Sequence, residues 1–243
     1  MTLLRSALFN AWFFLATFVI AFAGFALRWV GTRHALGLAQ FWAGVVLWGA
    51  RRICGIEMVV LGQEYLPTGP ALIASEHQSA FDTLIWLRLV PRVAYVFKSE
   101  LARVPFFGPL LVPAGQIPVE RGAVGGGLRS LLRGGARAVA DGRQILIFPE
   151  GTRVEFGAEV PLRPGIAALS RHTGLPIIPV ATDSGKLWSS RAFSKRAGQI
   201  HVVLCPPVPA GLSQEDTLAL LRERWREGHA RIPSVDNSVH EAA

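Results

Sequence analysis

Short apolar runs alternate with polar turns over most of this chain. Mostly apolar segments of strand length occupy residues 56–61, 71–74, 93–97, 116–120, 144–148, 175–182 and 200–204. Between them, apolar residues recur at helical spacing over 84–89, 128–139, 164–172 and 213–228. Strands that alternate with helices indicate an α/β domain with a mainly parallel central sheet flanked by helices.

The first 52 residues have a different pattern. Ser6 to Leu27 contains no charged residue, and this length approaches the roughly 20 residues that span a bilayer. A second uncharged run, Ala35 to Ala50, is short for a span and ends at Arg51 and Arg52. We predict a membrane-associated helical pair over residues 1–52. Two alternatives stay open: a cleaved signal peptide ending at Ala21-Phe-Ala23, and a single span followed by a surface helix.

The remaining chain is expected to form one domain over residues 53–230, followed by a disordered tail over 231–243. The formal net charge of +8 suits anionic lipid or a phosphorylated substrate. No block of lysine and arginine with interleaved aromatic residues occurs, so a nucleic-acid partner is not expected. Cys54 and Cys205 have no ligand spacing, and neither a metal site nor a disulfide framework is predicted.

Polar residues follow four of the predicted strands directly. They are His77 with Asp82, then Lys98, then Arg121, and finally Glu150 with Arg153. The carboxyl ends of parallel strands lie at one edge of a sheet, so these turns should converge. Histidine suits proton transfer near neutral pH, while arginine and lysine bind phosphate oxygens. The pattern therefore predicts a base beside a cationic pocket for an anionic substrate.

The spacing of His77 and Asp82 limits their geometry. Residues five apart do not share a helix face, so the pair requires His77 before a helix and Asp82 in its first turn. Ser79 with Asp82 resembles a capping box, and this segment alone favours a purely structural cap. Taken alone, each of the cations Lys98, Arg121 and Arg153 would be interpreted as a solvated surface charge. His201 is predicted to be a strand surface residue, and His229 to lie near the end of the last helix.

The order of these motifs resembles the glycerolipid acyltransferase family. Four segments carry the resemblance: Glu76-His-Gln-Ser-Ala-Phe-Asp82, Gly115-Gln-Ile-Pro-Val-Glu-Arg121, Phe148-Pro-Glu-Gly-Thr-Arg153 and Leu175-Pro-Ile-Ile-Pro179. Lys98-Ser-Glu-Leu101 and Pro105-Phe-Phe-Gly108 resemble the family segment between the first two motifs. Glu76 and Pro118 depart from it, since asparagine and an aromatic residue are usual there, and this leaves the acceptor in question.

The resemblance implies transfer of an acyl chain from a thioester to the free hydroxyl of a lysophospholipid, with 1-acyl-sn-glycerol 3-phosphate as the expected acceptor and phosphatidate as product. It implies His77 as general base and Asp82 as its orienting carboxylate. The acceptor phosphate would be bound by a larger set: Lys98, Arg121, Glu150, Gly151, Thr152 and Arg153. No cofactor is implied beyond acyl-CoA or acyl carrier protein as co-substrate. The expected location is the inner membrane, with the catalytic domain on the cytoplasmic side among membrane lipids.

Three rival functions remain open at this point. The same fold could act on another lysolipid, such as a lyso-ornithine lipid. A metal-dependent hydrolase could use His77, Asp82 and Glu150 as ligands, although no second histidine stands at ligand spacing. A membrane protein without activity could use the basic turns to bind anionic lipid.

Overall fold

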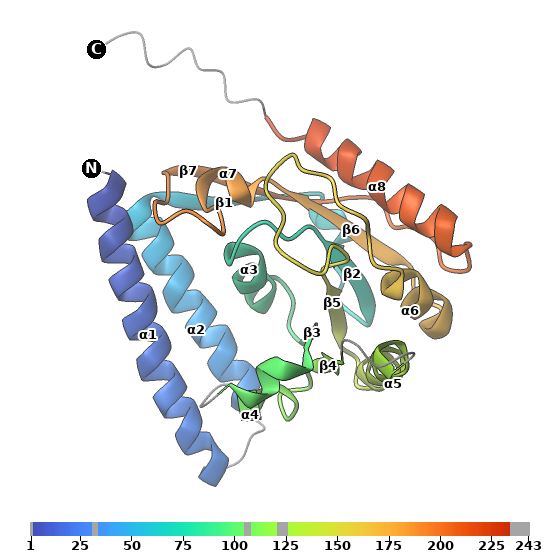
Figure 1. The fold of residues 1–243 in the computed structure, drawn as a ribbon, viewed down its shortest axis with the longest axis horizontal. Coiled ribbons are helices and arrows are strands. Elements are labelled where there is room, and N and C mark those ends of the chain that lie inside the picture. Colours follow the sequence, from blue (N-terminus) through green and yellow to red (C-terminus); the bar gives the residue numbers. More distant parts are fainter. Residues whose placement is uncertain (1, 31–33, 105–107, 121–125, 234–243) are drawn as a thin grey trace.

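The computed structural model describes residues 2–30, 34–104, 108–120 and 126–233 (Figure 1). Within these residues, a seven-stranded sheet has the strand order β1-β7-β6-β2-β5-β3-β4. The strands are β1 (Ile56–Leu61), β2 (Ala71–Ser75), β3 (Val93–Lys98), β4 (Ile117–Val119), β5 (Gln144–Ile147), β6 (Ile177–Thr182) and β7 (Gly198–Leu204). The predicted α/β class is confirmed.

Strand direction places five strand ends at one edge of the sheet. β2 is parallel to both β5 and β6, and β3 is parallel to both β5 and β4. β7 is antiparallel to β6 and parallel to β1, so β1 and β7 run the other way. The carboxyl ends of β2 to β6 therefore share an edge, as the predicted mainly parallel sheet requires.

Helices cover both faces of the sheet. They are α1 (Thr2–Val30), α2 (Ala35–Gly49), α3 (Phe81–Leu89), α4 (Gly108–Leu111), α5 (Gly126–Ala140), α6 (Gly165–Thr173), α7 (Ser184–Leu187) and α8 (Gln214–Ala230), with short helical turns η2 (Ala50–Cys54), η3 (Gln63–Tyr65) and η4 (Ser99–Arg103). Ser213 caps α8, because its hydroxyl accepts the N–H of Asp216.

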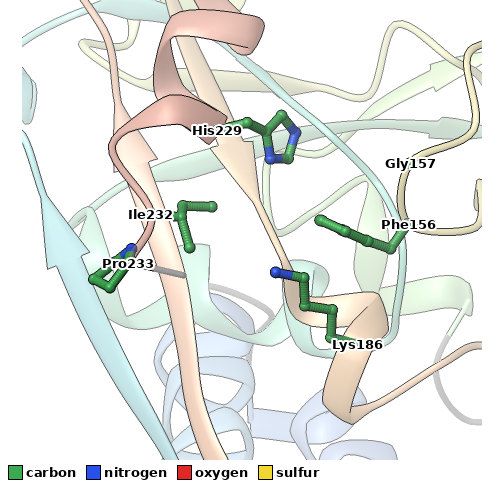
Figure 2. A pocket seen from close by; sticks show the side chains of 6 residues that line it. All are labelled: Phe156, Gly157, Lys186, His229, Ile232 and Pro233. Atoms are coloured by element: carbon green, nitrogen blue, oxygen red, sulfur yellow. The ribbon is translucent and has the colours of Figure 1, made fainter. Parts of the chain in front are cut away.

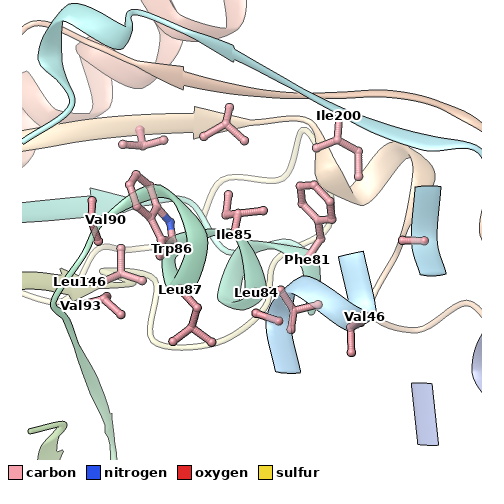
Figure 3. Close-up of a cluster of buried hydrophobic side chains, with 14 of the residues drawn as sticks. Val46, Phe81, Leu84, Ile85, Trp86, Leu87, Val90, Val93, Leu146 and Ile200 are labelled. Atoms are coloured by element: carbon pink, nitrogen blue, oxygen red, sulfur yellow. The ribbon is translucent and has the colours of Figure 1, made fainter. Parts of the chain in front are cut away.

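The central strand β2 separates two hydrophobic cores. Ala71 and Ile73 pack with residues of α1, α2 and α3, whereas Leu72 and Ala74 pack with residues of α5, α6 and α8. Every residue of β2 is buried, which explains why its sequence is a continuous apolar run instead of an alternating one. Figure 3 shows the first core, where Phe81 and Trp86 of α3 lie against the sheet.

The amino-terminal helices α1 and α2 lie side by side along one side of the domain (Figure 1). Among the described residues, α1 is the one helix long and apolar enough to cross a membrane, over Thr2–Phe25. α2 has 15 residues and falls short of that length. Large apolar side chains of α1 are exposed: Leu3, Leu4, Leu8, Phe14, Leu15, Phe18, Val19 and Phe22.

The start of α1 is anchored to the globular domain. Lys195, which is 7% exposed, donates from Nζ to Asn10 Oδ1 at 2.6 Å, and its backbone N–H donates to Ser6 Oγ at 2.8 Å. The ring of Phe9 meets Trp188 edge-on, with 5.0 Å between ring centroids. Residues 6–10 are therefore part of the packed fold of the described chain.

Candidate active site

His77 lies where the chain leaves the buried strand β2 and before α3 begins at Phe81. Its Nδ1 is 3.5 Å from Oδ2 of Asp82, which stands in the first turn of α3. The ring keeps 14% of its side-chain surface exposed, whereas the Asp82 carboxylate has none. The arrangement required by the five-residue spacing is therefore present, with Nδ1 directed toward the carboxylate.

The Asp82 carboxylate is held mainly by the backbone. Oδ2 accepts the N–H of Gln78 at 2.6 Å and the N–H of Ser79 at 2.7 Å. Among the described residues, Asp82 Oδ1 and His77 Nδ1 have no hydrogen-bond partner. The 3.5 Å separation is thus an ion-pair distance and not yet a hydrogen bond. Catalytic contacts of this kind often shorten only when substrate is bound.

Ser79 and Asp82 form the predicted capping box. Ser79 Oγ accepts the N–H of Phe81 at 3.0 Å, and Asp82 Oδ2 reaches back to accept the N–H of Ser79 at 2.7 Å. Ala80, between Ser79 and the first residue of α3, already has helical backbone angles. Ser79 is 0% exposed, so its hydroxyl is not accessible as a nucleophile.

The turn after β5 makes three contacts with His77, which are one ring stack and two hydrogen bonds. The Phe148 ring stacks on the imidazole at 4.0 Å between centroids and 16° between planes. The backbone N–H of His77 donates to Glu150 Oε2 at 2.7 Å, and the N–H of Val154 donates to the His77 carbonyl at 2.8 Å. The first and third motifs therefore meet at the sheet edge, because β2 and β5 are neighbouring parallel strands.

Burial, together with the negative charge of Glu76, raises the pKa of Glu150 to about 9 against the opposing effect of the His77 N–H. Glu150 is consequently protonated at neutral pH. Its carboxyl group then keeps one oxygen to accept from His77 and gains an O–H donor. This neutral form differs from the charged carboxylate that a sequence motif suggests.

Replacing Glu150 with glutamine should make stability less dependent on pH. The native pKa lies above the usual value of 4.5, so folding keeps a proton that the unfolded chain releases. Stability is then greatest below the unfolded pKa and falls as pH rises toward the native pKa, by up to about 1.4 kcal/mol per pH unit. Glutamine keeps the acceptor and does not titrate. Chemical unfolding between about pH 6 and pH 8 should show a steeper loss for the parent than for Glu150→Gln; parallel curves would contradict the raised pKa.

The remaining predicted site residues lie on the same edge or outside the described residues. Lys98 is the exposed last residue of β3, and Thr152 and Arg153 are exposed in the turn after β5. Gly151 adopts a left-handed φ of 72°, which only glycine reaches without strain. Arg121 and the tail from residue 234 lie outside the described residues, so their placement stays a prediction.

Glu76 has a role that the sequence did not indicate. Its Oε2 accepts the N–H of Thr182 at 2.9 Å, and Nε2 of His229 lies 2.9 Å from the same oxygen. Burial lowers the pKa of His229, but the hydrogen bond and charge of Glu76 outweigh it and leave the pKa raised. The pair joins the residue before His77 to β6 and α8. A separation of 153 residues left no local signal for it.

Gln78 strengthens the same junction between the turn before α3 and the end of β6. Gln78 Nε2 donates to the Thr182 carbonyl at 2.7 Å, and its Oε1 accepts the N–H of Gly185 at 2.9 Å.

The prediction for His201 is wrong. His201 is buried, not on the strand surface. Its Nδ1 lies 3.1 Å from Asp183 Oδ2, and its backbone N–H donates to Asp183 Oδ1 at 2.7 Å. β7 is covered on both faces, which is why the alternation expected of a surface strand is absent.

Two small cavities flank the junction on the α8 side. The first, of about 160 Å³, is lined by Phe156, Gly157, Lys186, His229, Ile232 and Pro233 (Figure 2). The second, of about 130 Å³, is lined by residues that include Glu76, Gln78 and Glu150. Within the described residues, no three His, Cys, Asp or Glu side chains group as metal ligands. The Glu150 carboxyl group is hydrogen-bonded to the backbone N–H of His77. It is therefore not arranged with the His77 ring around a common metal position.

The fold and the sequence around the site match a known class of protein, the acyltransferases. A model of that family matches residues 57–183, which include His77, Asp82, Lys98 and the Glu150 turn. The solved 1-acyl-sn-glycerophosphate acyltransferase of Thermotoga maritima has the same fold, with a TM-score of 0.74 and 21% identity. The alignment covers 96% of this chain and 100% of that one.

Two curated relatives narrow the class. The 1-acyl-sn-glycerol-3-phosphate acyltransferase of Pseudomonas aeruginosa is 32% identical over 206 residues, 83% of this chain and 80% of that protein. The human 1-acyl-sn-glycerol-3-phosphate acyltransferase alpha is 28% identical over 221 residues, 89% of this chain and 76% of that protein. The chain belongs to the 1-acyl-sn-glycerol-3-phosphate acyltransferase family.

Proposed function

We propose that this protein transfers an acyl chain from a thioester donor to the free hydroxyl of 1-acyl-sn-glycerol 3-phosphate, which yields phosphatidate. The observation that carries the proposal is the fixed imidazole of His77. It is stacked on Phe148, faces the buried Asp82, and is held through its backbone by Glu150. The relatives that bear the name of this activity span most of the chain and supply the acceptor class.

The reaction begins with proton transfer to His77. With Nδ1 directed at Asp82, Nε2 is the nitrogen that takes the proton of the acceptor hydroxyl. The oxygen attacks the thioester carbonyl carbon, and the tetrahedral intermediate collapses as the C–S bond breaks. His77 returns the proton to the leaving thiolate. Asp82 stabilises the imidazolium that exists between these two transfers.

The acceptor phosphate is assigned to the cations at the same edge. Lys98 supplies a point charge, while Arg121 and Arg153 supply planar donors that match phosphate oxygens. Gly151 and Thr152 shape the turn that carries Arg153, and Gly151 lets the ligand approach the backbone closely. Glu150 contributes as a neutral carboxyl group that fixes the His77 backbone and helps to shape the proposed phosphate pocket.

Membrane association is assigned to residues 1–52 as a helical pair, with the catalytic domain over 53–230 on the cytoplasmic side. The exposed apolar side chains of α1, together with Phe41 and Trp48 of α2, offer a surface for acyl chains. Anchoring of α1 through Lys195 would keep this surface in a fixed position relative to His77. The active site would then receive both of its lipids at the bilayer surface.

A panel of acceptors on purified protein tests the assignment. Arg153→Ala should lower kcat/KM for 1-acyl-sn-glycerol 3-phosphate by roughly 10- to 100-fold, the value of one or two charge-assisted hydrogen bonds. It should leave the slower transfer to a phosphate-free monoacylglycerol unchanged. Arg226→Ala, which removes an exposed arginine paired with Glu159, serves as the matched control. Equal losses for both acceptors would remove the phosphate role from Arg153.

The same panel tests a lyso-ornithine lipid and other lysolipids as acceptors. A cationic head group would need an unpaired carboxylate near His77. Glu76 does not supply one, because its carboxylate is occupied by Thr182 and His229. We therefore expect the phosphorylated acceptor to have the highest kcat/KM. No turnover of any acceptor, with vesicle binding retained, would instead identify an anionic-lipid-binding protein.

A further inference from the structure

The outer surface of α5 and α6 is strongly basic. Arg129, Arg133 and Arg137 of α5 and Arg171 of α6 are exposed, and neither helix contains an acidic residue. The two helices pack against each other, so the four arginines stand on neighbouring elements. We call these four residues the arginine face.

The arginine face follows from the pattern of α5. Residues four apart lie on one side of a helix, and Arg129, Arg133 and Arg137 have that spacing. The other side of α5 buries Leu131 and Ala138 in the second core, against β5 and α6. The apolar side is thus used by the fold and cannot enter a bilayer, although a basic amphipathic helix in isolation is typical of a membrane-surface segment.

Several arginines of other elements have acidic partners. Arg222 and Arg226 of α8 pair with Glu159, Arg224 pairs with Glu227, and Arg191 pairs with Glu155. The arginine face has no ion pair with any residue in the part of the chain that the structure describes. Four like charges without counterions raise the local potential and attract an acidic partner.

The position of the arginine face excludes the bilayer as the natural partner. Ala71 and Ile73 of β2 point to the core beneath α1 and α2, whereas Leu72 and Ala74 point to the core beneath α5, α6 and α8. The exposed apolar side chains of α1 and the arginine face thus lie on opposite sides of the sheet, as Figure 1 shows for the helices. A partner of the arginine face approaches from the aqueous side.

The arginine face also leads to the active edge. β4 ends there at Val119, and α5 begins seven residues later at Gly126, with Arg129 in its first turn. α6 follows the turn that carries Glu150 and runs in the same way from this edge. A protein seated on α5 would have one end beside the edge where His77 lies.

We propose that the arginine face docks an acidic acyl carrier protein, which delivers the acyl thioester to His77 from the side opposite the membrane. This inference rests on the proposed function, since it concerns how the donor of that reaction arrives. Carboxylates on a helix of the carrier would pair with the arginines, whose planar donors match carboxylates two at a time. Docking gives the carrier-bound donor an advantage that acyl-CoA, which lacks the protein surface, does not share.

Charge reversal on α5 tests the proposal with two donors. Arg129→Glu with Arg133→Glu should lower kcat/KM for acyl carrier protein by about tenfold and flatten its dependence on salt. kcat/KM for acyl-CoA of the same chain length should not change. Arg191→Glu with Arg226→Glu makes the same change in net charge at exposed sites on other elements, and should affect neither donor selectively.

Each other outcome has a definite meaning. Equal losses for both donors, or no loss for either, would overturn the docking role. Reduced binding to anionic vesicles by the α5 variant would assign the arginine face to the membrane and also overturn it. If the parent protein uses acyl-CoA and no carrier-bound donor, docking fails while the proposed function stands. If the parent uses neither donor, the proposed function itself fails.

Discussion

Replacement of His77 by alanine should lower kcat for acyl transfer by about 100- to 10,000-fold, the usual contribution of a positioned general base. The acceptor hydroxyl is a poor nucleophile until its proton is removed, and no other group among the described residues of this edge replaces the imidazole. Ser79 is buried and engaged with Phe81, and Glu150 is protonated and faces the backbone. KM for the acceptor should change little, because the phosphate is assigned to separate cations.

The His77→Ala variant should still fold and bind membranes, since α1 and Lys195 are unaffected. His201→Ala provides a matched control, because His201 also stands beside a buried aspartate but belongs to β7. It should lower thermal stability and leave kcat within a few-fold of the parent. Turnover by His77→Ala near the parent rate would remove the base assignment and, with it, the mechanism.

Local patterns predicted those parts of the site that depend on neighbouring residues. The apolar run 71–74 ends in a polar turn, and this is enough to place His77 after a buried strand and Asp82 in the first turn of a helix. The parallel direction of β2, β3 and β5 then brings three of the four predicted turns to one edge, and the fourth, which carries Arg121, lies outside the described residues. These inferences succeed because strand and helix periodicities extend over only a few residues.

Contacts between distant segments were beyond such patterns. The pair of Glu76 and His229 joins the turn after β2 to α8, which packs on β6, and neither residue has a local sequence feature that indicates the other. His201 illustrates the same limit, because its burial depends on Asp183 following the neighbouring strand β6. The neutral state of Glu150 arises from burial together with Glu76, which a motif of six residues does not contain.

The segment Phe148–Arg153 therefore contacts His77 in addition to forming the turn that the motif predicts to bind phosphate. The motif predicts a phosphate-binding turn, and Arg153 remains available for that role. Glu150 and Phe148 of the same turn serve His77 directly, one through its backbone amide and the other through its ring. One turn thus contacts His77 and carries Arg153, so a phosphate bound at Arg153 would place the acceptor near His77.

Replacement of Asp82 by asparagine should lower kcat by about 100-fold or more while KM changes little. The carbonyl oxygen of the introduced asparagine can accept the two backbone amides that Oδ2 of Asp82 accepts now, so the turn before α3 keeps its acceptor. The negative charge that faces Nδ1 of His77 is lost, and the imidazolium formed during proton transfer loses its stabilisation in a buried setting. The new amide N–H₂ group also has no acceptor there, which should cost about 1–3 kcal/mol of stability.

Asp183→Asn is a control that separates the loss of kcat from the loss of stability. Asp183 is likewise buried, accepts a backbone N–H from His201, and lies 3.1 Å from a histidine Nδ1. Its amide should also cost stability, because the buried carboxylate accepts a backbone N–H, faces a histidine Nδ1 and in addition pairs with Lys186 Nζ at 3.7 Å. At a temperature well below both unfolding midpoints, kcat should fall for Asp82→Asn alone. A matching fall for Asp183→Asn, or an unchanged kcat for Asp82→Asn, would show that Asp82 supports only the fold and that His77 acts without it.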